Sequence, residues 1–191
     1  MIRVFKQFDN TKLRNFIEKI FFIEFMKKFN PYKHKCPKCK TKHPNWKKHS
    51  HYNRYFITFE NNTVIYNIIT VTRYQCSSCG STHAILPEII IPYRSYSFLF
   101  IVKAMKDYFA KSLTIVAICD KYNISVSTLY AWKALYIKHK KLWLGLLENL
   151  YISDVNFLDS IFSTHSLEDF FVTIGISFLQ NHIKKAKYKP P

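Results

Sequence analysis

Two Cys-x-x-Cys pairs, at 36–39 and 76–79, constrain the fold of this chain more than any other feature. Between them lie two runs rich in Tyr, Phe, Ile, Val and Thr, residues 52–59 and 64–74, separated by an Asn-Asn dipeptide. Alternating runs of this composition around a turn predict a β-hairpin. Because a hairpin returns the chain to its starting point, it brings the two cysteine pairs together.

This arrangement is typical of a zinc ribbon, in which two knuckles supply four thiolates to one tetrahedral ion. Gly80 directly follows the second pair, in a chain with only three glycines. The residue at that place in a knuckle often needs a positive φ, which glycine adopts at little cost. We therefore expect a structural Zn²⁺ site in which sulfur fills every position and none is open for a catalytic water. Its ligands are Cys36, Cys39, Cys76 and Cys79.

Other interpretations of the thiols have less support. Disulfides are rare in a reducing compartment, and a redox Cys-x-x-Cys comes singly, at the start of a helix after a strand. Histidine could replace a cysteine as ligand, and five histidines crowd the region: His34, His43, His49, His51 and His83. With four well-spaced cysteines we expect these to donate to phosphate or to the knuckles, with His83 contacting a metal ligand.

The charge of the chain points to a polyanionic partner. Its 29 Lys and Arg against 12 Asp and Glu give a formal net charge of +17, which favours nucleic acid, with DNA ahead of RNA. A membrane surface is the competing partner, but the basic residues spread from Arg3 to Lys189 rather than gathering beside one apolar helix. The apolar run 20–26 contains Glu24 and lacks the features of a leader. We expect a cytoplasmic, nucleoid-associated bacterial protein.

Apolar residues at helical spacing predict several helices, and 48% apolar composition is enough for a core. Ser95 or Ser97 is the expected N-cap of the second helix. The N-terminal helix and the apolar run 170–179 could pack in the core or at an interface, and we favour the core. The predicted helices span residues 10–29, 95–111, 114–122, 125–150, 155–162 and 167–185.

The third and fourth of these helices match a helix-turn-helix. This motif needs a small residue where the helices cross and, four positions later, a turn residue that tolerates positive φ. Cys119 and Asn123 fill these places. Apolar anchors are expected at Ile118, Tyr122, Ile124, Leu129 and Trp132. The alternative is a helical hairpin without a binding role.

Ser125 is the expected cap of the second helix of the pair, whose exposed face would enter the major groove of DNA. The residues expected to contact nucleic acid on this helix are Ser125, Ser127, Thr128, Tyr130 and Lys133. Basic residues of the ribbon are expected to contact phosphate, namely Arg54, Arg73, Lys47 and Lys48.

The expected fold is α+β, a zinc ribbon joined to a helical helix-turn-helix domain. We divide the chain into an N-terminal helix at 1–30, the ribbon at 31–93, the helix-turn-helix domain at 94–150 and a helical tail at 151–191. Only the end of that tail, KKAKYKPP, has the composition of a loose segment.

Several segments resemble a group of zinc-ribbon plus helix-turn-helix proteins found in Firmicutes and their mobile elements. They are CPKC, HSHYNRYF, RYQCSSCGSTHAILPEIIIPY, LTIVAICDKYNISVSTLYAWK and GISFLQNH, and they span most of the chain from Pro31 onward. The order of ribbon and helix-turn-helix is similar, more distantly, to the N-terminal DNA-recognition part of insertion-sequence transposases. The resemblance implies binding to transposon ends or to a regulatory site.

Such transposases continue into a catalytic domain with three metal-binding carboxylates, whereas this sequence shows only scattered acids. Asp154 and Asp159 are expected to cap and solvate helices. We therefore expect no enzyme and no small-molecule substrate, but a sequence-recognising DNA-binding protein, a transcription regulator or a transposase-like targeting component. The alternative is an accessory RNA- or protein-binding subunit of a mobile-element or defence ribonucleoprotein. A protein partner or a homodimer remains open.

Overall fold

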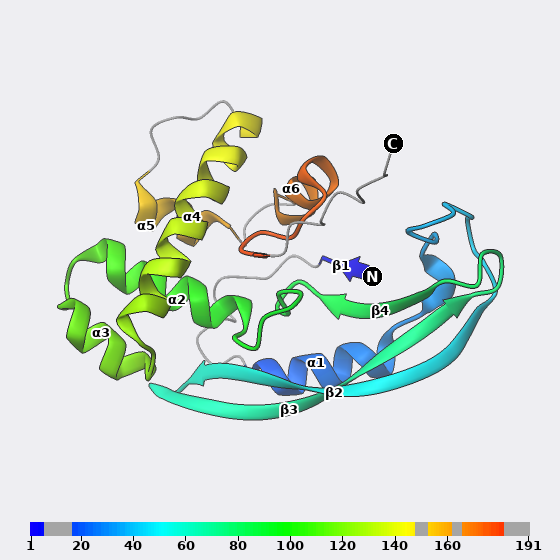
Figure 1. Cartoon of the computed structure of the whole chain (residues 1–191), viewed down its shortest axis with the longest axis horizontal. Coiled ribbons are helices and arrows are strands. Elements are labelled where there is room, and N and C mark those ends of the chain that lie inside the picture. Colours follow the sequence, from blue (N-terminus) through cyan, green and yellow to red (C-terminus); the bar gives the residue numbers. More distant parts are fainter. Residues whose placement is uncertain (6–16, 148–152, 162–165, 182–191) are drawn as a thin grey trace, which may run out of the picture.

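A computed structural model describes residues 1–5, 17–147, 153–161 and 166–181. The fold is α+β, with a four-stranded mixed sheet and helices on one side and one end of it (Figure 1). The strands are β1 (Ile2–Val4), β2 (Trp46–Glu60), β3 (Thr63–Cys76) and β4 (Thr82–Pro87). The helices are α1 (Glu18–Lys28), the 3₁₀ turn η2 (Pro31–Lys33), α2 (Phe98–Ala110), α3 (Ile115–Tyr122), α4 (Val126–Leu147), α5 (Asp154–Ser160) and α6 (Ser166–Ile174).

The predicted hairpin is confirmed and is longer than the sequence indicates. β2 and β3 pair antiparallel from Trp46 opposite Cys76 to Glu60 opposite Thr63. Asn61 and Asn62 form the turn with φ of 48° and 62°, the left-handed conformation that a tight hairpin turn requires. The hairpin runs as a long curved ribbon, with the cysteine loops at its open end and α3 near its closed end (Figure 1).

Two short strands complete the sheet in the order β1-β4-β3-β2. β4 pairs antiparallel with β3, and β1 pairs parallel with β4, with Ile2 opposite Ile85. The Arg3 guanidinium donates to the carbonyl oxygens of Leu86, Pro87 and Ile90 at 3.3, 3.0 and 2.6 Å. These bonds anchor the N-terminal strand to the end of β4.

α1 packs against the sheet, as expected for an amphipathic helix. Phe22 lies in an apolar cluster with Phe56 of β2, Ile69 of β3 and Leu86 of β4. The described helix starts at Glu18, and the first part of the predicted span, residues 10–16, lies outside the described residues.

The largest core joins the closed end of the hairpin to the helices. Ile57 and Phe59 of β2 lie in one cluster with residues of α2, α3, α4, α5 and the segment after α6. α2 begins after Ser97, whose hydroxyl accepts a hydrogen bond from the Phe100 N–H, so the predicted cap is confirmed. The run 170–179 contributes Phe170 and Leu179 to this core, as we expected.

The predictions for α3, α4 and α5 agree with the structure to within a few residues where they can be compared, whereas the predicted end of the last helix is wrong. α4 extends to Leu147, and residues 148–150 of its predicted span lie outside the described residues. α6 ends at Ile174, well before the predicted end at 185, and residues 182–191 are not described. A search of the described helices found none with the length and apolarity needed to cross a bilayer.

Candidate metal centre and candidate nucleic-acid surface

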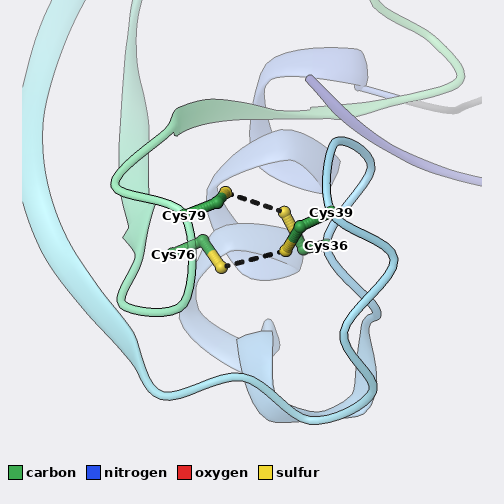
Figure 2. A group of neighbouring side chains, drawn as sticks. All are labelled: Cys36, Cys39, Cys76 and Cys79. Carbon is green, nitrogen blue, oxygen red and sulfur yellow. Dashed lines mark hydrogen bonds between the residues drawn. The ribbon is translucent and has the colours of Figure 1, made fainter.

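The hairpin brings the two cysteine pairs to one place at its open end. Cys76 ends β3 opposite Trp46, and the Ser77 N–H donates to the Asn45 carbonyl oxygen at 3.1 Å. Cys79 lies on the turn between β3 and β4, while Cys36 and Cys39 lie on the loop after η2. The four side chains point toward a common centre (Figure 2).

Both cysteine loops have the same main-chain geometry. In the first, Lys40 N–H donates to Cys36 O at 2.9 Å and Cys36 N–H donates to the carbonyl oxygen of Thr41 at 3.0 Å. In the second, Gly80 N–H donates to Cys76 O at 2.8 Å and Cys76 N–H donates to the carbonyl oxygen of Ser81 at 3.0 Å. The two loops are therefore equivalent knuckles, and each supplies two of the four cysteines of the site.

Each knuckle needs a positive φ after its second cysteine, as predicted for Gly80, whose φ is 66°. Sequence reasoning missed the matching residue of the first knuckle, because Lys40 adopts φ 63° although it has a side chain. The left-handed region costs a non-glycine residue roughly 1–2 kcal/mol. The geometry of the first knuckle therefore includes a local backbone cost at Lys40.

The spacing of the sulfur atoms fits a tetrahedral ion. All four Sγ atoms lie within 4.8 Å of one another, and the Cys36–Cys79 and Cys39–Cys76 pairs are both separated by 3.8 Å. Four sulfur atoms in a tetrahedron at a Zn–S distance of 2.3 Å would lie about 3.8 Å apart. The cluster is therefore compatible with a zinc site.

The local environment favours thiolates in part of the cluster. A hydrogen bond with the Thr41 hydroxyl, 3.2 Å from Cys39 Sγ, together with one from the Thr41 main chain, lowers the pKa of Cys39 to about 6. Hydrogen bonds with Ser81 lower the pKa of Cys79 in the same way. Burial raises the pKa of Cys36 to about 11. A bound cation would favour the deprotonated form of that buried thiol, because thiolate is the form that binds metal.

Apolar and aromatic residues surround the site. Cys36 and Cys76 are buried with Ile2, Trp46 and Ile85. The His83 ring lies edge-on to Trp46, and its Nε2 atom is 3.5 Å from Cys36 Sγ. His83 thus contacts a candidate ligand, as predicted, and burial lowers its pKa, which keeps the ring neutral.

Three of the other four histidines that the sequence offered as alternative ligands contact different partners, and His51 is exposed on β2. His34 stacks on Phe29, and His43 Nδ1 lies 2.8 Å from the Tyr32 carbonyl oxygen. His49 Nδ1 lies 3.0 Å from the Ser50 hydroxyl. Within the part of the chain that the structure describes, the group suited to holding a metal ion consists of the four cysteines.

The second candidate site lies on α3 and α4. Thr114 caps α3, and Asn123 ends it with φ 46°, so the predicted turn residue adopts the expected conformation. The Ser125 hydroxyl accepts from the Thr128 N–H at 3.2 Å, which confirms the predicted cap of α4. The predicted anchors are buried: Ile118, Tyr122, Ile124, Leu129 and Trp132, with Cys119 beside them.

On the outer side of α4, Ser125, Ser127 and Tyr130 are exposed, and Thr128 and Lys133 are partly exposed. Lys133 Nζ donates to the Tyr108 hydroxyl at 2.6 Å and lies over the Tyr108 and Tyr130 rings at 4.9 and 5.7 Å from their centroids. This hydrogen bond raises the pKa of Lys133, so the charge is retained.

The basic residues named on the hairpin differ in their accessibility. Lys47 and Lys48 are exposed beside the knuckles. Arg73 donates to the Thr82 hydroxyl at 3.0 Å. Arg54 donates to the main-chain carbonyl oxygens of Ile91 and Arg94 and serves to hold that loop against β2. The structure therefore places these four residues in two separate regions of the hairpin rather than in one patch.

The acids that the sequence assigned to helix ends pair with lysines of other helices. Asp154, at the start of α5, accepts from Lys140 at 2.7 Å and from the Tyr136 hydroxyl at 2.9 Å. Asp159 pairs with Lys106 at 2.6 Å. The N-cap of α5 is Ser153, whose hydroxyl accepts from the Asn156 N–H, so the prediction that these aspartates cap helices is wrong for Asp154.

The fold and the knuckles define an α+β protein with a four-cysteine site at the open end of a hairpin. The chain belongs to the family described as a domain of unknown function, DUF6431, whose model matches residues 36–132, a little over half of the chain. The match begins at the first knuckle cysteine and ends at Trp132 in α4. The comparisons found no matching curated protein and no matching solved structure.

Proposed function

We propose that this protein binds double-stranded DNA through α3 and α4 as a helix-turn-helix, and that a structural zinc ion in the four-cysteine site holds the hairpin supporting these helices. The observation that carries the proposal is the α3–α4 turn. Asn123 is left-handed, and the Ile124 N–H donates to the Cys119 carbonyl oxygen at 3.0 Å. This turn directs the N-terminal part of α4 outward with its polar side chains exposed.

The exposed residues of α4 suit contact with a major groove. Ser127 and Thr128 can bond to base edges or phosphate, and Tyr130 and Ala131 offer an aromatic ring and a methyl group. Lys133 supplies a positive charge one turn further along. The net charge of +17 would provide the affinity for phosphate that does not depend on sequence.

Zinc is the metal we assign to the cysteines, because four thiolates in tetrahedral geometry suit Zn²⁺ and leave no open position for catalysis. Its contribution would be to folding, since it would tie β2, β3 and both knuckles together. We propose that the protein acts without a catalytic step, as a transcription regulator or as a transposase-like targeting component of a mobile element.

To test the proposal, the full chain is used to select the duplexes that it binds from a random DNA library. Its affinity is then measured for the most enriched duplex and for a duplex of scrambled sequence. Ser127→Ala and Tyr130→Ala should reduce the preference for the selected duplex by about 1 kcal/mol or more for each lost base contact. Lys133→Ala should weaken binding to both duplexes and reduce the salt dependence by about one phosphate contact.

Lys28→Ala is the matched control, because it removes one exposed lysine on α1, far along the chain from α4. It should leave the preference for the selected duplex unchanged. If no sequence is enriched, or if the α4 variants bind like the wild type, the proposal that α4 recognises the DNA sequence is wrong. Binding to RNA or protein alone would then support an accessory subunit instead.

A further inference from the structure

An open groove lies between the edge strand β2 and the loop that follows β4. It has a volume of about 530 Å³, and we call it the tyrosine groove. Its lining includes Tyr52 and Tyr55 of β2, Tyr93 and Arg94 of the loop, and Leu86 of β4. A volume of this size is within the range of small-ligand sites, roughly 300–1,000 Å³.

The three tyrosine rings of the groove are exposed, at 38% for Tyr52, 64% for Tyr55 and 69% for Tyr93. Most aromatic side chains of this protein are instead packed in its apolar clusters, as Phe56 and Phe100 are. Tyr52 and Tyr55 are three residues apart on β2, so their side chains leave opposite faces of the strand, on either side of its free edge beside the groove. Single exposed tyrosines are ordinary, but three around one groove place three aromatic rings within reach of one bound strand.

Tyr93 adopts a conformation that normally favours glycine. The Arg94 N–H donates to the Ile91 carbonyl oxygen at 3.3 Å, which closes a turn over residues 91–94 with Pro92 in its second position. Tyr93 follows with φ 65°, where turns of this kind usually contain glycine. The left-handed conformation is a local cost for a residue with a large side chain, and strain of this kind is typical of functional positions.

Arg54 holds the loop in place. Its guanidinium donates to the main-chain carbonyl oxygens of Ile91 and Arg94, which flank the strained residue. Arg54 therefore fixes the main chain on both sides of Tyr93 against β2. This role explains a basic residue that sequence reasoning had placed in contact with nucleic acid.

The charge at the groove is positive. Arg94 makes no ion pair with any described residue, and the described lining of the groove contains no acidic side chain. The Arg94 Nε atom also lacks a hydrogen-bond acceptor among the described residues. An anionic group beside the loop would be stabilised by the positive charge of Arg94, whereas the Arg54 guanidinium is already engaged by main-chain carbonyl oxygens.

We propose that the tyrosine groove binds unpaired bases of single-stranded nucleic acid, which stack on Tyr52, Tyr55 and Tyr93 while Arg94 contacts the adjoining phosphate. Every base has a flat face, so rings combined with a positive charge bind single strands with little dependence on sequence. This site is separate from α4 and does not rest on the proposed recognition of duplex DNA.

The test must separate stacking from charge, because a chain of net charge +17 attracts any polyanion. Fluorescence anisotropy of the full chain would compare labelled oligo(dT), oligo(rU) and an abasic deoxyribose-phosphate strand of equal length, about 10 nucleotides. In about 0.2 M salt, at least one base-bearing strand should bind about tenfold or more tighter than the abasic strand. The dT and rU arms distinguish DNA from RNA as the source of the bases.

Tyr55→Ala and Tyr93→Gly should each weaken binding of the preferred base-bearing strand by about tenfold, and Tyr55→Phe should retain it, because the ring is kept. Tyr93→Gly relieves the backbone strain but adds entropy to the unfolded chain, so its melting temperature should change little, and a melting temperature close to that of the wild type attributes the lost binding to the missing ring. Tyr32→Ala is the matched control, an exposed tyrosine at 51% that lies outside the groove, and it should bind like the wild type.

Equal affinity for base-bearing and abasic strands would overturn the proposal, as would unchanged binding by Tyr55→Ala and Tyr93→Gly. The same groove variants should bind the duplex selected in the α4 experiment with unchanged affinity. The two proposals can therefore fail separately. If substitutions on α4 abolish duplex recognition but the chain shows no preference for base-bearing single strands, the inference about the tyrosine groove is wrong and the proposed function stands.

Discussion

The side-chain amide of Asn123 donates a hydrogen bond to the hydroxyl of Tyr66, 3.0 Å away. Tyr66 belongs to β3, near the closed end of the hairpin, and Asn123 forms the left-handed end of α3. The bond joins the sheet to the turn that orients α4. The hairpin therefore connects the cysteine site at its open end to the helix pair at its closed end.

Removing the Tyr66 hydroxyl should slightly weaken the contact between β3 and the α3–α4 turn. For Tyr66→Phe we expect the free energy of unfolding to fall by about 0.5–1 kcal/mol, because the bond is exposed and water replaces part of it. Urea unfolding measures the change. Tyr55→Phe is the control, since Tyr55 is exposed to a similar extent, 64% against 60%, and lies on the paired strand. Equal losses in the two variants would mean that the bond contributes nothing.

The two knuckles should respond differently to substitution of the residue that follows their second cysteine. Gly80→Ala places a side chain at φ 66° where the added Cβ meets no atom within 4 Å, so the cost is that of the backbone alone. We expect a loss of about 1 kcal/mol of unfolding free energy. Lys40→Gly relieves the same conformation but adds entropy to the unfolded chain, and should change stability by less than about 0.5 kcal/mol. Thermal unfolding that shows Gly80→Ala unaffected would contradict this account of the knuckles.

Glu18 should make the protein less stable as pH rises. This carboxyl is 1% exposed and accepts a hydrogen bond from the Ser97 hydroxyl at 2.8 Å. Burial raises its pKa from 4.5 to about 8, against the opposing effects of Ser97 and Lys103. Between these two values the folded chain keeps a proton that the unfolded chain releases. The contribution of Glu18 is therefore complete below pH 4.5 and is lost as pH rises through about 8.

Glu18→Gln stays neutral, so its stability relative to the wild type should increase steadily across this pH range. Glu24→Gln, an exposed substitution on the same helix, is the control and should show no such trend. Urea unfolding at a series of pH values measures both. Parallel pH profiles for the wild type and Glu18→Gln would show that Glu18 titrates normally in the folded protein.

Substitution of one knuckle cysteine should destabilise the open end of the hairpin and lower the zinc content. Substitution of the fifth cysteine, Cys119, should leave the zinc content unchanged. Cys39→Ser removes a ligand without removing much buried surface, because Cys39 is exposed, and we expect reduced zinc content and a lower melting temperature. Cys119 is a buried residue of α3 in the largest core, so Cys119→Ser should retain the zinc content of the wild type while losing about 1 kcal/mol of stability from buried packing. Equal zinc content in both variants would contradict the assignment of ligands.

The features that could be predicted from sequence are those with a strong local cause. The hairpin follows from alternating residues around Asn61-Asn62, and the caps at Ser97 and Ser125 follow from hydroxyls that precede apolar helical spacing. The cysteine cluster follows from two equal spacings at the ends of that hairpin. In each case a few neighbouring residues determine the geometry.

The features that could not be predicted depend on long-range contacts. β1 is only three residues long and is a strand because it pairs with β4, which lies more than eighty residues away in sequence. Lys40 gives no local sign of its positive φ, because the metal-knuckle geometry overrides its preference. Arg54 holds the 91–94 turn through hydrogen bonds, and three tyrosines lie around the groove beside that turn. Neither feature can be predicted from sequence, because both depend on how the loop packs against β2.

The central claim is that four sulfur atoms hold one zinc ion at the open end of the hairpin. X-ray absorption at the zinc edge of the purified full chain, with metal content measured on the same sample, tests it directly. We expect one zinc ion per chain with four sulfur neighbours at about 2.3 Å. The absence of stoichiometric zinc, or a nitrogen ligand from His83 in place of one sulfur, would contradict it.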